Sequence, residues 1–269
     1  MPELPDVEAM RRYLLSQDIV GSSITGTDLY WPSAIKAPSP ERFVAGLVAQ
    51  RVASLERRGK FLLFGLDGQT LVLHLRMTGS LVMAPEEEPY HRFVRNVLLL
   101  DSGKAMWFVD PRKLGMMWLV KDVAPVIGHL GPEPLEPEFT PEVLAGILRG
   151  KGLPIKVLLC EQSAMAGIGN IYADEILFCA GLHPERKAEA VSFQEIQALH
   201  ECTVTVLREA TERLSGLLPI PGPPTESAAG AAVLKVPRSY GAGCPHCGTS
   251  IQRLVIRGRS AYLCPRCQQ

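Results

Sequence analysis

The chain has 269 residues, 46% of them hydrophobic, and a formal net charge of zero at pH 7. This length predicts two domains, or one domain with an appendage, with enough apolar side chains to bury a core. The sequence has no apolar run of about 18 residues and begins without the basic and apolar blocks of a secretory signal, so we expect a cytoplasmic protein without a membrane span.

The first predicted element is a helix that begins a few residues from the amino terminus. Pro5 suits an opening helical position, and the acidic side chains Asp6 and Glu8 fall in the first turn. Apolar residues then recur at helical spacing from Val7 to Leu15. We therefore expect the amino terminus to be held close to a rigid element.

From about residue 22 to 121 the sequence changes to the pattern of short strands. Asp-Gly and Ser-Gly pairs, which favour hairpin turns, separate four apolar segments: 61–64, 71–75, 96–100 and 105–109. Short strands in succession are typical of a β-sandwich or barrel.

The second half of the chain is predicted to be helical. Three prolines within residues 131–137 indicate an interdomain linker. Beyond it, apolar residues follow helical spacing over 141–149, 154–162, 171–180 and a long segment from Ser192 to about Gly216. Ser192 and Glu195 have the spacing of a capping box, whereas residues 217–232, rich in proline, glycine and alanine, predict a mobile surface loop.

Four of the seven cysteines form two close pairs, Cys244 with Cys247 and Cys264 with Cys267. This spacing is typical of four thiolates around one tetrahedral Zn2+ ion, and residues 251–263 between the pairs predict the hairpin of a zinc ribbon. Because the pairs supply all four ligands, we expect a structural ion. Residues 235–269 contain six basic side chains and no acidic one, so we expect this ribbon to face phosphate.

The other three cysteines are predicted to be buried, reduced thiols: Cys160, Cys179 and Cys202. Each stands alone in an apolar, helical context, where cysteine behaves as a small hydrophobic side chain. We assign them no chemical role.

The start Met1-Pro2 favours removal of the initiator methionine, because a small second residue permits it. Pro2 then offers a secondary amine, whose reference pKa of roughly 8 leaves a neutral, nucleophilic fraction near pH 7. Attack on a carbonyl-level carbon forms an iminium, and Glu3 beside it is suited to transfer protons. From these residues alone, the start of a helix without any chemistry is the alternative.

The chain resembles the formamidopyrimidine-DNA glycosylase and endonuclease VIII family in blocks that occur in the family's order: 2–8, 58–60, 74–80, 110–115, 167–172 and 264–268. The resemblance implies an α+β fold with three parts. These are an N-terminal β-sandwich with flanking helices over residues 1–130, a helical helix-two-turn-helix domain over 131–232, and a zinc ribbon over 233–269.

The resemblance also implies a bifunctional DNA glycosylase and AP lyase that removes oxidised or ring-opened bases from damaged double-stranded DNA through a proline Schiff base and β,δ-elimination. At matching positions, Pro2 looks like the nucleophile at deoxyribose C1′ and Glu3 like its acid partner. Lys60 is similar to the lysine that contacts phosphate and transfers a proton in β-elimination, and Arg259 to the ribbon arginine credited with δ-elimination. We expect a monomer that works on DNA of the nucleoid.

Seven further positions match DNA-binding residues of the family. Met77, Arg112 and Leu114 match side chains that fill the gap left by an extruded base, and such filling offsets lost stacking and pairing. Phosphate contacts are implied at His74, His91, Lys151 and Asn170, although the position aligned with Lys151 could instead be Gly152. Glycines before Asn170 let backbone N–H groups approach a phosphate at a helix start.

Two departures leave the substrate open. Leu114 replaces the commoner phenylalanine, so its stacking is weaker, and residues 217–238 lack the aromatic residue of the loop that covers 8-oxoguanine. Substrates could therefore be 8-oxoguanine, formamidopyrimidines or oxidised pyrimidines. The alternatives are an endonuclease VIII-like enzyme for oxidised pyrimidines, a non-catalytic DNA-binding relative, and a zinc-ribbon interaction protein without DNA.

Overall fold

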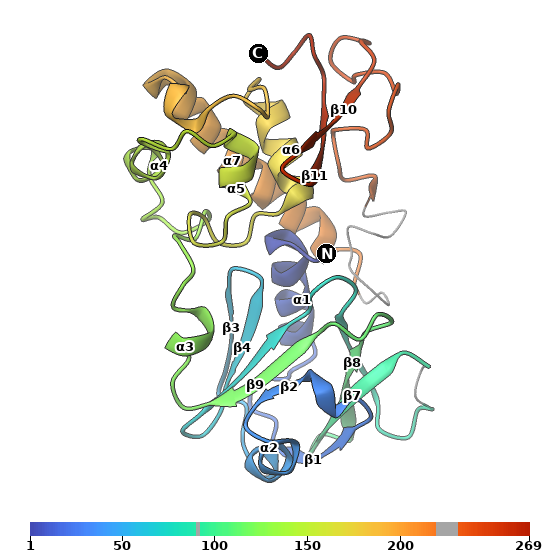
Figure 1. Cartoon of the computed structure of the whole chain (residues 1–269). Helices are drawn as coiled ribbons and strands as arrows, with labels where there is room; N and C mark the ends of the chain where they lie inside the picture. The colour runs from blue at the N-terminus through green and yellow to red at the C-terminus, as the bar shows by residue number, and fades with distance from the viewer. Residues whose placement is uncertain (90–91, 219–230) are drawn as a thin grey trace. The chain divides into compact units, whose positions relative to one another are not determined.

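The structure is a computed structural model that describes residues 1–89, 92–218 and 231–269. The chain divides into two compact units (Figure 1). Unit 1 comprises Met1–Gly128 with Thr211–Ala231, and unit 2 comprises His129–Ala210 with Ala232–Gln269. His91 and most of the loop expected at 217–232 lie outside the described residues.

Unit 1 is built mainly from strands. Its elements are α1 (Leu4–Ser16), β1 (Ile24–Leu29), η1 (Pro32–Ala34), β2 (Ile35–Ala37), α2 (Pro40–Leu47), β3 (Ser54–Arg58), β4 (Phe61–Gly65), β5 (Thr70–His74), β6 (Ser80–Pro85), β7 (Val94–Leu100), β8 (Lys104–Val109), β9 (Met116–Val120) and α3 (Ala124–Ile127). Both predicted hairpins are present, as β4–β5 and β7–β8.

The strands of unit 1 form two sheets, ordered β1-β7-β8-β6 and β2-β9-β5-β4-β3. One buried core joins them: Leu62 and Leu73 come from the five-stranded sheet, Leu98 and Met106 from the four-stranded one, and Met10 from α1. Helix α1 packs against β3 and β4, and α2 packs against β1 and β2. The predicted sandwich with flanking helices is confirmed.

Unit 2 is helical and ends in a hairpin. Its elements are α4 (Pro141–Leu148), α5 (Ile155–Leu159), α6 (Asn170–Cys179), η2 (Ala188–Ala190), α7 (Phe193–Ser215, whose last turn belongs to unit 1), β10 (Gln252–Ile256) and β11 (Arg259–Leu263). The predicted capping box is present, since the Glu195 carboxylate accepts the Ser192 N–H at 2.8 Å and Ser192 Oγ accepts the Glu195 N–H at 3.4 Å. No helix in the described part of the chain has the length and apolar character of a membrane span.

The proline-rich stretch at 131–137, expected as a linker, lies within unit 2. Gly131 donates its N–H to the Gln162 carbonyl at 2.8 Å, and Pro132 accepts the N–H of Ala166 at 2.9 Å. A Cβ on Gly131 would overlap the backbone of Ser163 and Ala164. These residues are therefore packed, and the units divide slightly earlier, after Gly128.

The prediction of three reduced thiols is wrong for two of them. Cys179 at the end of α6 and Cys202 in α7 form a disulfide, with their Cα atoms 5.8 Å apart. Helical packing brings the two residues within bridging distance although 23 positions separate them in the sequence. Cys160 is buried, as predicted.

Candidate active site and nucleic-acid interface

The amino terminus of unit 1 is fixed by the first turn of α1. Pro2 is buried, and Glu3, the N-cap residue, is only 2% exposed. The Asp6 carboxylate accepts the Glu3 backbone N–H at 3.0 Å, satisfying a donor that the helix leaves without an internal partner. The residues predicted to supply nucleophile and acid thus share one rigid, buried helix start.

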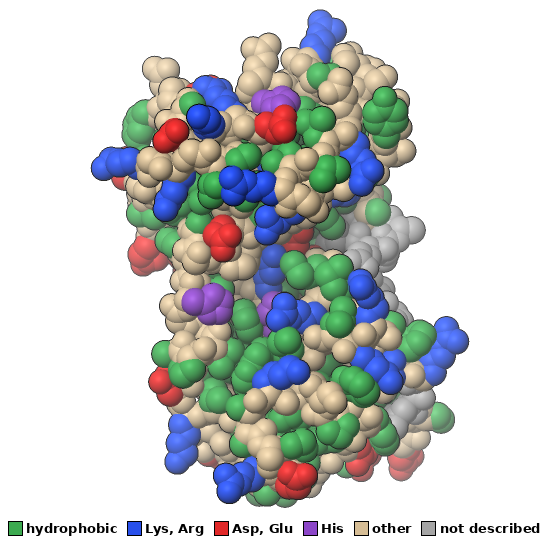
Figure 2. Space-filling view, in the orientation of Figure 1, with side chains coloured by type: hydrophobic (Ala, Val, Ile, Leu, Met, Phe, Trp, Pro, Cys, Tyr) green, Lys and Arg blue, Asp and Glu red, His purple; other side chains and the backbone are tan. Residues whose placement is uncertain are grey.

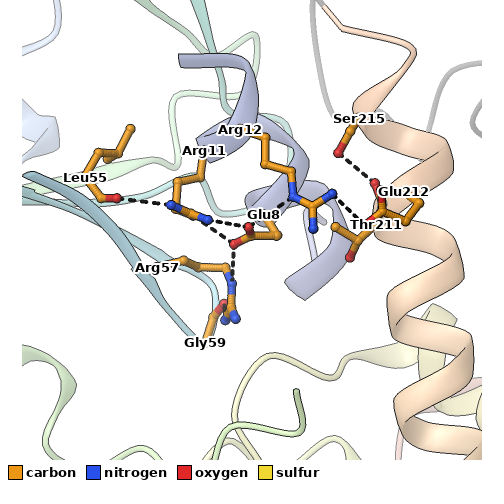
Figure 3. A network of polar contacts seen from close by, with 9 residues as sticks. All are labelled: Glu8, Arg11, Arg12, Leu55, Arg57, Gly59, Thr211, Glu212 and Ser215. Atoms are coloured by element: carbon orange, nitrogen blue, oxygen red, sulfur yellow. Dashed lines mark hydrogen bonds and ion pairs between the residues drawn. The ribbon is translucent and has the colours of Figure 1, made fainter. Parts of the chain in front are cut away.

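A network around Glu8 joins α1 to the turn before β4 (Figure 3). The Glu8 carboxylate accepts hydrogen bonds from Arg11 Nη2 at 2.7 Å and from Arg57 Nε at 3.1 Å. Arg57 in turn donates to the Gly59 carbonyl at 3.1 Å. Gly59 precedes Lys60, so the network fixes the turn of the predicted lysine against the helix of Pro2 and Glu3.

The charge balance of this network keeps Glu8 ionised. Burial alone would raise the pKa of the Glu8 carboxyl, but the hydrogen bonds and charges of Arg11 and Arg57 outweigh it and hold that pKa below its ordinary value. Arg12 extends the network to Glu212 at 2.8 Å, in the part of α7 that belongs to unit 1 (Figure 3).

Lys60 and His74 lie at neighbouring strand ends. Both are buried, with exposures of 4% and 9%, and Phe61, which follows Lys60, pairs with His74 across β4 and β5. Burial, then the charges of Arg76 and Lys60, lower the pKa of His74 to about 3. His74 Nδ1 accepts the Arg76 N–H at 3.0 Å, which places the proton of the neutral ring on Nε2. His74 is thus a neutral donor.

The three predicted gap-filling residues lie on two loops of unit 1. Met77, 37% exposed, belongs to the loop between β5 and β6, whereas Leu114, 41% exposed, and the exposed Arg112 belong to the loop between β8 and β9. Large apolar side chains at such exposure in a packed sandwich are available to another molecule.

In unit 2, Asn170 opens α6 directly after a glycine turn. Gly167 has a φ of +87°, and Gln162 braces the turn by accepting the Gly167 N–H at 3.0 Å and donating to the Ile168 carbonyl at 2.7 Å. The amide oxygen of Asn170 is buried and makes no hydrogen bond within the described residues. Lys151 is exposed in the loop between α4 and α5, where its backbone bonds Leu148 and Glu189 rather than this turn.

Arg259 begins β11 after a two-residue turn, Arg257-Gly258, in which both residues have positive φ, as a type I′ hairpin requires. The hairpin is fixed to α5 and α6 through Lys156, which is fully buried. Lys156 Nζ donates to the Ser260 carbonyl at 2.6 Å and to Asp174 at 2.5 Å. Asp174 lies one turn after Asn170 in α6. This helix therefore contains Asn170 and, through Asp174 and Lys156, also supports Ser260, the residue after Arg259.

The Lys156–Asp174 pair is strongly desolvated. Burial lowers the pKa of the Lys156 ammonium and raises that of the Asp174 carboxyl, while their mutual contact acts in the opposite direction. Arg238 adds a second donor to Asp174 at 2.9 Å. Each of the two buried charges is therefore stabilised by the other and by Arg238 and the Ser260 carbonyl, and removal of one would leave the other desolvated.

The four predicted zinc ligands converge in unit 2. Their sulfur atoms all lie within 4.8 Å of one another: Cys244, Cys247, Cys264 and Cys267. Individual separations of 3.5 and 3.9 Å approach the roughly 3.8 Å edge of a tetrahedron with Zn–S bonds of about 2.3 Å. His246 instead packs against Phe178, 4.7 Å between ring centroids. The cysteines form a closed site for one structural zinc ion.

Sequence reasoning missed several residues that organise the site. Glu8 has the spacing of an ion pair with Arg11 and Arg12, but its bond to Arg57 spans 49 positions. Asp110, fully buried, lies within the family block 110–115, and an Asp-Pro pair after a strand is the signal that could have identified it, since it is typical of a turn organised by the carboxylate.

Charge on the surface is mixed with apolar side chains. On the face of unit 1 in Figure 2, Lys and Arg side chains are interspersed with hydrophobic ones, and acidic side chains gather toward the lower end. Such a surface suits contact with an anionic, partly apolar partner.

Three family models match successive parts of the chain. The formamidopyrimidine-DNA glycosylase N-terminal domain matches residues 1–117, and the H2TH domain of the same enzyme matches residues 130–218. A zinc finger found in FPG and IleRS matches residues 244–269. These matches confirm the predicted helix-two-turn-helix part and zinc ribbon.

Curated relatives and solved structures agree over the full length. The chain is 42% identical to formamidopyrimidine-DNA glycosylase of Geobacillus kaustophilus, covering 100% of both, and 41% identical to that of Symbiobacterium thermophilum, covering 100% of this chain and 89% of the relative. It is similar to Lactococcus lactis Fpg in complex with abasic-site DNA (TM-score 0.89, 30% identity, 99% of each chain). It is equally similar to MutM in complex with carbocyclic 8-oxo-G DNA (TM-score 0.89, 30% identity, 100% of each). The chain therefore belongs to the formamidopyrimidine-DNA glycosylase family.

Proposed function

We propose that the protein is a bifunctional DNA glycosylase and AP lyase that excises oxidised or ring-opened bases from double-stranded DNA and then nicks the strand. The observation that supports this most directly is the helix start of unit 1. Pro2 and Glu3 are buried there, and the Glu8–Arg57 network fixes the turn of Lys60 against the same helix. A catalytic site requires its nucleophile and proton-transfer groups to be held in a fixed geometry, and this helix start is rigid.

In the proposed reaction, the amine of Pro2, exposed by removal of Met1, bonds to deoxyribose C1′ as the glycosidic bond breaks. Glu3 transfers a proton so that the sugar opens and an iminium forms. Loss of a C2′ proton, assisted by Lys60, then expels the 3′ phosphate. A second elimination, with Arg259 at the phosphate, expels the 5′ phosphate.

The remaining site residues have binding roles. Met77, Arg112 and Leu114 fill the duplex after base extrusion, and His74, His91, Lys151 and Asn170 contact phosphates. His74 acts as a neutral donor through Nε2, because its pKa of about 3 keeps it uncharged. Asn170 opens α6, and the backbone N–H groups at a helix start are donors that suit an approaching phosphate group.

We also propose the organisation that accompanies this activity. The sandwich over residues 1–130 contains Pro2, Glu3 and Lys60. The helical part over 131–232 and the ribbon over 233–269 grip the backbone of DNA, and the ribbon adds Arg259. The zinc ion supports the ribbon and takes no part in the reaction. The protein acts as a monomer on DNA in the cytoplasm, at the nucleoid.

Borohydride trapping on abasic-site DNA tests the chemistry. The mature protein, with Met1 removal confirmed by mass, is expected to give a covalent adduct, because borohydride reduces the iminium to a stable amine. P2G, which replaces the secondary amine by a primary one, should form the adduct more slowly, whereas P5A, a change to a neighbouring buried proline, should form it at the wild-type rate. E3Q should slow base release more than trapping.

A panel of duplexes separates the alternatives. Preference for thymine glycol over 8-oxoguanine and formamidopyrimidine would favour an endonuclease VIII-like enzyme. DNA binding without any adduct would favour a non-catalytic relative. Salt-insensitive or absent DNA binding would favour an interaction protein.

A further inference from the structure

The two gap-filling loops of unit 1 are both crossovers between its sheets. Residues 75–79 connect β5 in the five-stranded sheet to β6 in the four-stranded one, and residues 110–115 connect β8 back to β9. In the registers, His74 pairs with Met116 and Ser80 pairs with Val109. Both loops therefore leave the same end of the sandwich and run side by side.

One buried carboxylate organises the second loop. Asp110 Oδ2 accepts the N–H groups of Leu114 at 2.7 Å and Gly115 at 2.8 Å, and Oδ1 accepts the N–H of Arg112 at 3.2 Å. Asp110 is fully buried. Because a desolvated carboxylate depends on its donors, the backbone of this loop is held in one conformation.

The same carboxylate reaches across to the first loop. Thr78 Oγ1, in the residue after Met77, donates to Asp110 Oδ1 at 2.6 Å and accepts the Arg112 N–H at 3.3 Å. The hydroxyl thus joins the two loops through both its donor and its acceptor functions.

Both loops turn sharply at the residue before the gap-filling side chain. Arg76, before Met77, has a φ of +55°, and Lys113, before Leu114, has a φ of +56°. Non-glycine residues keep this conformation only where their surroundings enforce it. Here the Arg76 N–H bonds His74 Nδ1, and the Lys113 ammonium lies over the Trp31 ring, 4.5 Å from its centre.

The loops also have little room to relax. A Cβ on Gly79 would overlap the Leu75 carbonyl, and a Cβ on Gly115 would overlap the Phe108 ring. Because both loops are closely packed at their ends, each is a stiff segment. The hydrogen bond from Thr78 to Asp110 connects these two segments.

We propose that Thr78 and Asp110 are positioning residues that join the two loops into one rigid element, so that Met77 and Leu114 enter the duplex together. This inference rests on the proposed function, since it assumes that both side chains fill the gap left by an extruded base. Neither Thr78 nor Asp110 needs to touch DNA.

Single-turnover kinetics test this proposal. T78V removes the hydroxyl at nearly constant shape, and T78S retains it. On a duplex lesion that the wild type excises, T78V is expected to slow excision about tenfold, the effect of losing one hydrogen bond to a charged group, and T78S less than about twofold. 2-Aminopurine beside the lesion, which brightens on unstacking, should respond more slowly with T78V.

Nicking at a preformed abasic site separates positioning from damage to the fold. There is no base to unpair at such a site, so T78V should nick it within about twofold of the wild-type rate. Equal slowing of nicking and excision would overturn the proposal, because it would indicate a general structural defect.

A double-mutant cycle tests whether the loops act together. With Thr78 present, M77A and L114A each impair the same rigid element, so the double variant should excise the lesion only slightly more slowly than the slower single variant. In the T78V background the two effects should multiply. Multiplicative effects already in the wild-type background, or unchanged excision by T78V, would overturn the proposal that Thr78 and Asp110 join the loops. A wild type that excises no lesion would instead refute the proposed function.

Discussion

The two units hold their proposed site residues by different means. In unit 1 the Lys60 turn and the gap-filling loops are held by hydrogen bonds to the buried carboxylates Glu8 and Asp110. In unit 2 the Arg259 hairpin depends on four zinc-binding thiols and on the Lys156–Asp174 pair, and a disulfide ties α6 to α7. The scaffold of unit 2 can therefore be disrupted by chelation and weakened by reduction without replacing any residue that is proposed to contact DNA.

Removing zinc is expected to have the largest effect. Binding of a structural zinc ion contributes on the order of 10 kcal/mol to the folding of small ribbons, so C247S or a strong chelator should disorder β10–β11 and abolish tight DNA binding. Metal content per chain and DNA gel shifts measure this. H246A is the matched control and should keep its zinc, since His246 is outside the sulfur cluster. Full DNA affinity without metal would show that the ribbon is dispensable.

Breaking the buried ion pair comes next. K156M leaves Asp174 desolvated with Arg238 as its remaining cationic partner, and the free energy of unfolding should fall by about 3–5 kcal/mol. The control is K235M, which removes an ion pair with Glu209 whose two side chains are 48% and 44% exposed. This variant should change the free energy of unfolding by at most ~1 kcal/mol. Urea unfolding measures both. Equal effects would mean that Lys156 is not essential to the scaffold.

Reduction of the disulfide should be milder. Loss of the Cys179–Cys202 link, which encloses 23 positions, should lower stability by about 3 kcal/mol. Thermal melts of wild type and C202S with and without reductant measure this: the wild type should respond to reductant and C202S should not. C160S should respond as the wild type does. Alkylation of both cysteines in native, unreduced protein would contradict the pairing.

The smallest effect is expected in unit 1, from the titration of His74. The pKa of His74 is about 3 in the folded protein against an ordinary value of 6.5, so the unfolded chain binds the proton first as pH falls. Stability contributed by the neutral ring is complete above pH 6.5 and declines below it, by at most about 1.4 kcal/mol per pH unit. Urea unfolding at pH 7 and pH 5 should show this loss in the wild type and little of it in H74N. Parallel losses in both proteins would mean that His74 is not the titrating group.

Local patterns in the sequence were sufficient for most elements and for the metal site. The Cys244–Cys247 and Cys264–Cys267 pairs, the Ser192 capping box and the hairpins all depend on residues a few positions apart, where spacing determines geometry. The family resemblance added, as expectations, the positions suited to the chemistry.

Contacts between distant segments were not predictable in this way. The bond from Arg57 to Glu8 spans 49 positions and that from Thr78 to Asp110 spans 32, and nothing in helical or strand periodicity pairs them. The disulfide was missed for the same reason, because Cys179 and Cys202 each look like an ordinary apolar position until α6 and α7 pack. The residues suited to chemistry were thus visible in the sequence, while those that hold them were not.

The hydrogen bonds of the Asp110 carboxylate fix the number of residues in the loop between β8 and β9. The carboxylate reaches the N–H groups four and five positions ahead, and these are the last amides before β9 begins. An insertion or deletion between 110 and 115 would shift those donors and also slip the strand that follows. The loop can therefore accept different side chains, such as leucine at 114, but it cannot change in length without losing these hydrogen bonds.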